Sequence, residues 1–378
     1  MSPQPAPRDL RGIEGLDSLL DRRPFSGRAP EDIPRVLTDV LGVPTIPAAT
    51  AVEELGGWTR NGVDGALLRW STGFGPDTEA FLLRPSGETG PLPGIVALHC
   101  HGGMKRYGKE KIADGPDAVS AQIQAFRDEC YSGRAVANEF ARAGNVVLVH
   151  DAFGWGSRRV PVENMPWRSE HIAGLELDER RRAGEPLDEA REYDLHAGPH
   201  EDVMAKTLGV LGTSWGGVIV RDDLIAAQIL AARPGVRDGG VTVAGLSGGG
   251  ARAVLATALS DDIRAAAVIA MMSTMDAMLD GYLHSHTWAF MNPGIGRVAD
   301  WPDIAACRAP RPLFVGYAER DALFPLEGMR AADEVIRRHY ESRNAGEAYS
   351  AHWVDAPHSF DAATQRAFLS WLADLGTP

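Results

Sequence analysis

The segment Gly240-Val241-Thr242-Val243-Ala244-Gly245-Leu246-Ser247-Gly248-Gly249-Gly250 decides the fold of this chain. A short, β-branched apolar run ends in a glycine–serine–glycine turn, and the helix-forming run Ala251–Leu259 follows at once. This is the strand–turn–helix context in which G-x-S-x-G forms a nucleophile elbow. Because the turn is sharp, the residues around the serine must be small. The helix that starts there directs its free N–H groups and its positive dipole end towards the group under attack. Ser247 is therefore the expected nucleophile.

A second segment, Gly212-Thr213-Ser214-Trp215-Gly216, matches the same pattern. The run Val203–Val210 before it is not a strand bounded by turns, and bulky Trp215 stands where an elbow needs a small residue. Residues Gly216–Ala232 have the pattern of an amphipathic helix that ends at Arg233-Pro234-Gly235. We expect Ser214 to lie near the start of this helix and to take no part in catalysis.

The composition is that of a globular protein. The chain has 378 residues, of which 44% are hydrophobic and 24% charged, enough for one large α/β domain. A net charge of −13 argues against a nucleic-acid partner. We find neither a secretory signal pattern nor an apolar run of membrane-spanning length, so a cytoplasmic protein without membrane contact is expected. The sequence leaves the oligomeric state open.

Three cysteines, Cys100, Cys130 and Cys307, are far apart in the sequence. Such spacing suits a reducing compartment and provides no disulfide framework.

The order of the remaining segments indicates a mostly parallel sheet with helices on both faces. An antiparallel pair of strands is expected first, and then apolar strands that alternate with helices. The expected strands are Ala66–Trp70, Ala80–Pro85, Gly94–Cys100, Asn145–Asp151, Gly240–Leu246, Ala265–Met272, Pro312–Tyr317 and Ala351–Val354.

The chain divides into an N-terminal helical extension, residues 1–60, and a main domain, residues 61–378. Within the main domain, residues 155–210 break the alternation of strands and helices with a charged, irregular stretch for which we expect one short helix between Leu175 and Tyr193. An insertion of this length favours a lid over the site, although a surface decoration is the alternative.

A serine nucleophile needs a base, and the base needs an acid that orients it. In a sheet with an elbow these groups follow in the order serine, acid, histidine, each after a later strand. Asp321 follows the strand Pro312–Tyr317, and His358 follows the strand Ala351–Val354. Ser247, Asp321 and His358 are therefore the predicted catalytic residues. Glu319 is the alternative acid, and His352, inside a strand, is the alternative base.

Two backbone donors are expected to bind the oxyanion. One is the N–H of Gly248, and the other comes from Gly102 or Gly103 in the loop after the strand Gly94–Cys100. The residues expected to line the pocket, with core packing as the alternative for the tryptophans, are His99, His101, Trp155, Trp215 and Trp288. Although the chain also contains His150, His284 and His286, the histidines lack a ligand pattern, and we expect neither a metal nor another cofactor.

Over roughly residues 80–375 the chain resembles the α/β-hydrolase superfamily, through Gly245-Leu246-Ser247-Gly248-Gly249 and the loops that carry Asp321 and His358. Three further segments resemble bacterial acetyl xylan esterase-like and dienelactone hydrolase-like members: Leu98–Gly103 with Gly108-Lys109-Glu110, Asp151–Arg158, and Pro310–Leu313. The resemblance implies an α/β-hydrolase fold and cofactor-free hydrolysis of a small carboxylic ester, with an acetyl or other short acyl group, through an acyl-enzyme. Alternatives on the same residues are a peptidase, a lactone hydrolase or a transacylase, and a binding protein without activity is the alternative from another class.

Overall fold

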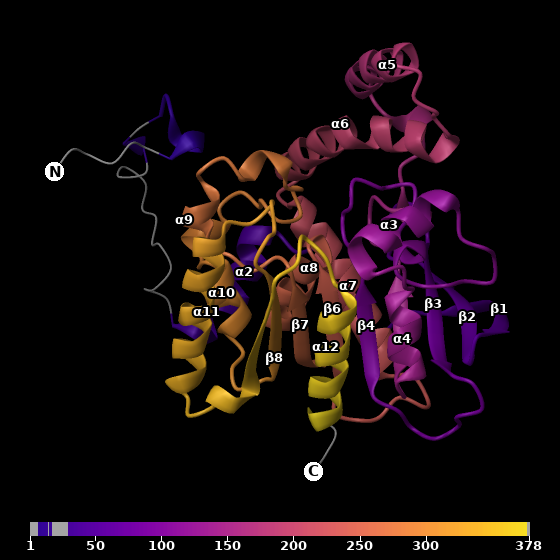
Figure 1. Cartoon of the computed structure of the whole chain (residues 1–378), viewed down its shortest axis with the longest axis vertical. Coiled ribbons are helices and arrows are strands. Elements are labelled where there is room, and N and C mark those ends of the chain that lie inside the picture. Colours follow the sequence, from indigo (N-terminus) through magenta and orange to yellow (C-terminus); the bar gives the residue numbers. More distant parts are fainter. Residues whose placement is uncertain (1–6, 14, 17–28, 376–378) are drawn as a thin grey trace.

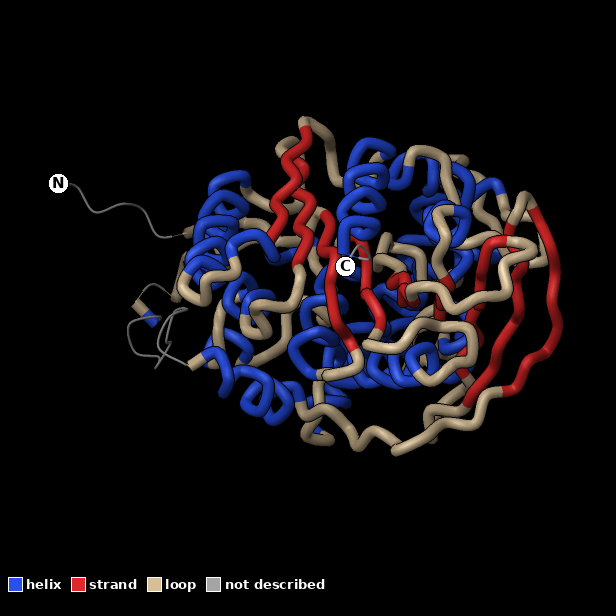
Figure 2. The backbone as a smooth tube through the Cα atoms, turned by 90° about the horizontal axis from the view of Figure 1, so that it is seen from below, coloured by secondary structure: helices blue, strands red, loops and turns tan. Residues whose placement is uncertain are grey.

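A nine-stranded mixed sheet forms the centre of the protein in a computed structural model, which describes residues 7–13, 15–16 and 29–375 (Figures 1 and 2). The strand order is β1-β2-β3-β5-β4-β6-β7-β8-β9. Its strands are β1 (Glu53–Arg60), β2 (Val63–Trp70), β3 (Thr78–Pro85), β4 (Gly94–Leu98), β5 (Val146–His150), β6 (Val241–Leu246), β7 (Ile263–Ile269), β8 (Leu313–Ala318) and β9 (Tyr349–Val354).

The sheet has an antiparallel and a parallel part. Each strand in the series β1, β2, β3 and β5 is antiparallel to the next. Strands β5, β4, β6, β7, β8 and β9 are all parallel to one another. The β4, β5 and β6 strands are buried at every position, which explains their largely apolar sequences. Parallel strands end at the same edge, so the loops after β4, β6, β8 and β9 all open on one side of the molecule.

Helices cover both faces of the sheet, as the sequence predicted, and Figure 2 shows the strands between them. One hydrophobic core packs under α2, α7, α8, α10 and α11, and the other packs under α3, α4 and α12. The helices are α2 (Ile33–Leu41), α3 (Ala121–Tyr131), α4 (Val136–Arg142), α5 (Trp167–Arg182), α6 (Glu189–Val210), α7 (Trp215–Ala231), α8 (Gly248–Leu259), α9 (Met275–Met278), α10 (Trp301–Ala306), α11 (Leu326–Glu341) and α12 (Ala362–Leu375).

The N-terminal region differs from the expected helical extension. Residues 53–60 form β1, an edge strand that pairs antiparallel with β2 and is therefore part of the main sheet. The helical part that is described is α2 together with short 3-10 turns at Arg8–Leu10 and Pro30–Asp32. Residues 1–6, 14 and 17–28 of the expected extension lie outside the described residues.

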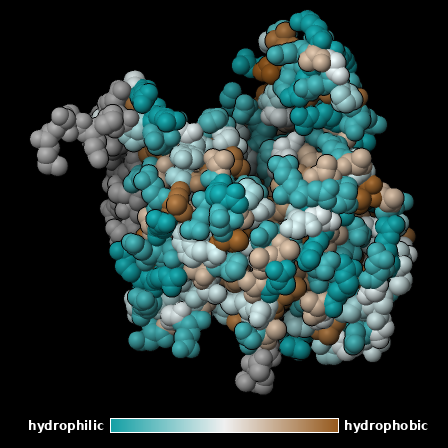
Figure 3. Space-filling view, in the orientation of Figure 1, coloured by the Kyte–Doolittle hydropathy of each residue, from teal (hydrophilic) through white to brown (hydrophobic). Residues whose placement is uncertain are grey.

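The insertion contains two long helices, where the sequence suggested one short one. Helices α5 and α6 form a hairpin that projects above the rest of the protein in Figure 1. Trp167 and Leu175 on α5 are 73% and 62% exposed, and hydrophobic residues are visible at the tip of the hairpin in Figure 3. Glu and Arg side chains fill seven of the other fourteen positions of α5, which hid its helical pattern from a periodicity argument.

No single described helix combines the length and apolarity that crossing a membrane would need. Helices α6 and α7 reach that length and apolarity only when they are taken together, and the chain bends by 88° between them. All three cysteines are buried and free.

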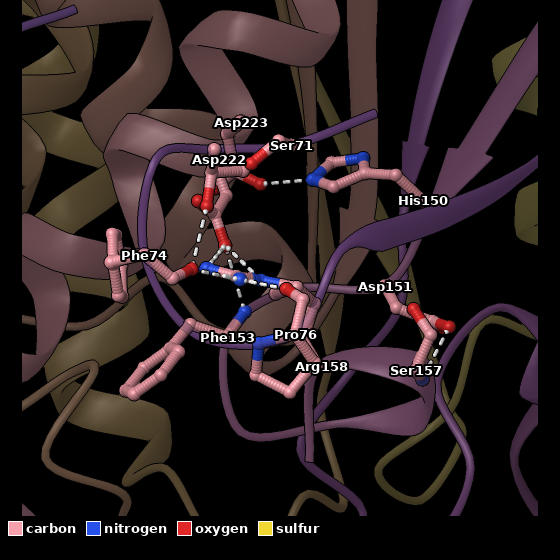
Figure 4. A network of polar contacts seen from close by, with 12 residues as sticks. Ser71, Phe74, Pro76, His150, Asp151, Phe153, Ser157, Arg158, Asp222 and Asp223 are labelled. Atoms are coloured by element: carbon pink, nitrogen blue, oxygen red, sulfur yellow. Dashed lines mark hydrogen bonds and ion pairs between the residues drawn. The ribbon is translucent and has the colours of Figure 1, made fainter. Parts of the chain in front are cut away.

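Buried charges connect the loop before β3, the segment after β5 and the middle of α7. Arg158 is completely buried, and Figure 4 shows it between Asp222 and the carbonyl groups of Phe74 and Pro76, to which it donates. Burial raises the pKa of Asp222, although Arg158 opposes this effect. The guanidinium therefore holds the loop before β3 against α7, with its charge balanced inside the protein.

We predict that Arg158→Met lowers the free energy of unfolding by about 3–5 kcal/mol, because it leaves the Asp222 carboxylate and two carbonyl groups buried without their donor. Urea unfolding measures the change. The control is Arg35→Met, since Arg35 forms an exposed ion pair with Asp32 at 3.5 Å and should contribute less than about 1 kcal/mol. Equal effects of the two substitutions would contradict this account.

Candidate active site

Ser247 lies at the sharp turn between β6 and α8, with φ 55° and ψ −121°. Only small neighbours permit this strained conformation. A Cβ on Gly245 would overlap the backbone of Gly249, and a Cβ on Gly249 would overlap the carbonyl oxygen of Leu98 in β4. The glycines of the motif are therefore required by the packing of the first turn of α8 against two strands. Within the described part of the chain, Ser247 Oγ makes no hydrogen bond.

Ser214 has a different environment, as predicted. It is the N-cap of α7, with φ −130° and ψ 165°, and its Oγ accepts from Gly217 N at 3.0 Å. The same hydroxyl donates to Leu41 O at 2.9 Å, and the residue is 7% exposed. This hydroxyl is used in capping a helix.

Asp321 and His358 lie side by side at the ends of β8 and β9. His358 Nδ1 is 2.6 Å from Asp321 Oδ2, and Asp321 Oδ1 accepts from Leu323 N at 2.8 Å. The Asp321 side chain is completely buried, whereas the imidazole is 20% exposed. The carboxylate thus fixes the ring so that Nε2 remains for other partners.

The alternatives for the acid and the base have other surroundings. Glu319 is exposed. His352 lies within β9 and stacks on Phe314 with ring centroids 6.0 Å apart. No hydrogen bond or ring contact joins either side chain to the Asp321–His358 pair.

The loop after β4 passes over the start of α8. A Cβ on Gly248 would lie 3.1 Å from the backbone nitrogen of His101, which places the peptide groups of these residues next to each other. Gly103 N–H donates to Nδ1 of His101 at 3.0 Å, so this N–H is already used. Of the two predicted glycines, Gly102 keeps an N–H without a partner among the described residues. His101 N–H is also without one, and its position escaped sequence reasoning that looked only for glycine.

Comparison with known proteins gives the fold a name. Solved structures with similar chain paths include a provisionally assigned acetyl xylan esterase from Bacteroides fragilis, with a TM-score of 0.62, 15% identity, and coverage of 86% of this chain and 74% of that chain. A glucuronoyl esterase from Solibacter usitatus has a TM-score of 0.58 and 13% identity, with coverage of 92% of this chain and 91% of that chain. Acetyl xylan esterase 1 from a Thermoanaerobacterium species has a TM-score of 0.54 and 15% identity, with coverage of 93% of this chain and 97% of that chain.

The chain has the α/β-hydrolase fold. Among curated proteins, YtaP of Bacillus subtilis strain 168, a provisionally assigned hydrolase, is 22% identical over 271 residues, which cover 71% of this chain and 74% of YtaP. No family model matches the sequence. The expected fold class and the likeness to acetyl xylan esterases are confirmed.

The residues expected to line the pocket of this α/β-hydrolase fold fall into two groups. His99, Trp155 and Trp215 are 1–3% exposed and pack beneath the surface. Burial lowers the pKa of His99 well below its usual value, and the nearby cations Lys111 and Arg252 act in the same direction. Only His101 and Trp288 keep partly exposed side chains, so these two alone can present surface to a substrate in this conformation.

Helix α6 contacts the loop after β4 through a carboxylate that sequence reasoning missed. Glu201 is 5% exposed and forms an ion pair with Lys105. Its Oε2 lies 3.2 Å from His101 Nε2, and its Oε1 accepts from Trp288 N at 2.9 Å. Burial alone would raise the pKa of Glu201, but Lys105 and His101 outweigh burial and hold it well below its usual range. One buried carboxylate thus joins the insertion to two loops of the site.

A second acid on α6 strengthens this connection. Asp194 Oδ1 accepts from the backbone nitrogens of Lys105 and Arg106 at 2.7 and 2.8 Å. Asp194 and Glu201 are seven residues apart, which is two helical turns and hence the same face of α6. No sequence signal pointed to either residue, because α6 is rich in acidic side chains and their partners lie about 90 to 100 residues away in the chain.

No group of three or more His, Cys, Asp or Glu side chains in the described ranges is arranged to hold a metal ion. His150, for example, instead contacts Asp223 Oδ1 at 3.0 Å.

We predict that Glu201→Gln lowers the free energy of unfolding by about 3 kcal/mol, because Lys105 would remain as a buried charge without its counter-ion. Amide hydrogen exchange should also accelerate along α6, since the substitution weakens its connection to the loop after β4. The control is Glu176→Gln on α5, whose exposed pair with Arg180 at 2.8 Å should contribute less than about 1 kcal/mol. Unchanged exchange along α6 would contradict this role.

Proposed function

We propose that this protein is a serine hydrolase that cleaves a carboxylic ester through an acyl-enzyme. The observation that carries the proposal is the arrangement of three strand ends: the strained elbow at Ser247, the buried Asp321 carboxylate, and its 2.6 Å contact with His358. All three lie at the carboxyl edge of the parallel strands, where sheets of this kind hold their reacting groups. The similarity to esterase structures supports the same reaction class.

The proposed reaction follows the chemistry of these groups. His358 takes the proton of the Ser247 hydroxyl while Oγ attacks the ester carbonyl. Asp321 orients the imidazole and stabilises its protonated form. The oxyanion that forms accepts hydrogen bonds from Gly248 N–H and from the loop after β4. His358 then protonates the departing alcohol, and in the second half it activates the water that releases the acid.

A small ester with an acetyl or other short acyl group is the proposed substrate, on the basis of the resemblance to acetyl xylan esterases. The α5–α6 hairpin forms one wall of the site in this proposal, since Glu201 connects it to His101 and Trp288. Nitrophenyl esters of acetate, butyrate and octanoate, tested beside lactone and aminoacyl substrates and an added acceptor alcohol, distinguish this substrate class from the lactonase, peptidase and transacylase alternatives.

We predict that a fluorophosphonate probe labels the wild-type protein once, as seen by intact mass. Ser247→Ala should abolish labelling, because the activated hydroxyl is gone, whereas Ser214→Ala should label normally, because Ser214 only caps α7. Labelling that disappears only in Ser214→Ala would identify the other serine as the nucleophile. A wild type that takes up no probe would contradict the proposal as a whole.

We predict that Asp321→Asn lowers kcat roughly 10³- to 10⁴-fold on a nitrophenyl ester, because an amide neither holds the required His358 tautomer nor stabilises the imidazolium. The matched control is Glu319→Gln, an exposed acid two residues earlier, which should keep wild-type activity. Steady-state kinetics on both variants test this. Comparable losses in the two variants would refute the assignment of Asp321.

A further inference from the structure

Two buried cationic side chains bind the end of β4 and the loop after it from the protein interior. Lys111 is completely buried, and its ammonium group donates to the carbonyl oxygens of Cys100 at 2.6 Å, His101 at 3.1 Å and Met104 at 3.1 Å. Arg252 of α8 donates to the carbonyl oxygen of His99 at 2.9 Å. Three consecutive carbonyl groups, those of residues 99–101, therefore point into the protein.

The orientation of these carbonyl groups fixes the N–H groups that follow them. In a trans peptide the N–H points opposite to the C=O, and Ala309–Pro310 is the one cis bond among the described residues. With the Cys100 and His101 carbonyl groups directed at Lys111, the N–H groups of His101 and Gly102 face the other way. Gly248 lies on that side, because a Cβ added to Gly248 would be 3.1 Å from His101 N.

No described carboxylate forms an ion pair with Lys111, which sets it apart from the buried lysine two residues before it. Lys109 Nζ lies 2.8 Å from Asp151 Oδ2 and 2.9 Å from Glu110 Oε1. Burial lowers the pKa of Lys111 to about 8, whereas Asp151 and Glu110 overcome burial and raise the pKa of Lys109. A lysine buried without a counter-ion costs stability, and its position is explained by the carbonyl groups that it binds.

We propose that Lys111 is a positioning residue of the oxyanion hole: by binding the carbonyl groups of Cys100, His101 and Met104, it holds the N–H groups of His101 and Gly102 towards the substrate carbonyl. This inference rests on the proposed serine hydrolase function. It acts through the backbone, and Lys111 itself contacts no substrate. Preorganised donors matter most in the transition state, so the residue should affect kcat rather than KM.

The test compares Lys111→Ala with Lys109→Ala on a nitrophenyl acetate. Lys111→Ala should lower kcat about 10- to 100-fold, which is a smaller loss than deleting an oxyanion-hole donor outright would cause. The same substitution should change KM less than about threefold. Lys109→Ala removes a buried lysine from the same turn but no contact with the loop carbonyl groups, so its kcat should stay within about threefold of wild type. Unfolding curves of both variants separate loss of fold from loss of turnover.

Added amines provide a readout that a purely structural role would not change. Methylammonium fits the space left in Lys111→Ala and can donate to the three carbonyl groups, so it should restore kcat at least about fivefold. Tetramethylammonium at equal ionic strength has no N–H and should not. Neither amine should alter Lys109→Ala. If Lys111→Ala fails to fold, Lys111→Met, which keeps most of the volume but donates nothing, is compared with Lys109→Met in the same assay.

The outcomes are separable from those of the proposed function. A wild type that neither hydrolyses esters nor takes up the fluorophosphonate overturns both proposals, since an oxyanion hole needs a nucleophile. An active wild type with Lys111 variants of full kcat overturns only the role of Lys111. The same conclusion follows if the loss lies wholly in KM, or if Lys109 variants lose as much kcat as Lys111 variants.

Discussion

Everything else in this fold depends on the close backbone contact between the first turn of α8 and the end of β4. Gly249 lies directly on the carbonyl oxygen of Leu98, and Gly245 lies against Gly249. No side chain fits at either place, so β4, β6 and α8 can approach only with glycine there. This approach puts Ser247 into its strained turn and brings the loop after β4 beside Gly248. The proposed acid and base, Asp321 and His358, reach the same edge because β7, β8 and β9 continue the parallel sheet.

Much of this arrangement could be predicted from the sequence, because it follows from local patterns. The elbow is a continuous segment whose strand, turn and helix are each encoded by their own residues. Asp321 and His358 could be located because each follows a recognisable apolar strand. Ser214 could be set aside because Trp215 does not suit an elbow. In each of these cases a short stretch of chain carries the whole signal.

The rest depends on contacts between distant segments, which leave no local trace. Glu201 looks like any other acid on a charged helix until α6 folds over the loop that contains Lys105 and His101. Lys111 belongs to a polar run, Lys109-Glu110-Lys111, whose residues would be expected at the surface, yet the side chain is buried among carbonyl groups. Trp155 and Trp215 contact the Lys105 ammonium through their rings, which explains their burial beside the site better than contact with a ligand does. The start of the sheet at residue 53 was hidden because the exposed, glycine-containing edge strand lacks an apolar face.

The strand order also dictates when the molecule can assemble during synthesis. β2 and β3 are neighbours in sequence and can pair as soon as both have left the ribosome. β4 is different: Ile95 pairs with Thr242, and the whole α5–α6 insertion and α7 are made between them. Until then one side of the apolar β4 strand has no partner, so the growing chain carries an open, hydrophobic strand edge while residues 99–241 are synthesised. The centre of the sheet is thus completed only when β6 is made, and β6 is the strand that leads into the proposed nucleophile, Ser247.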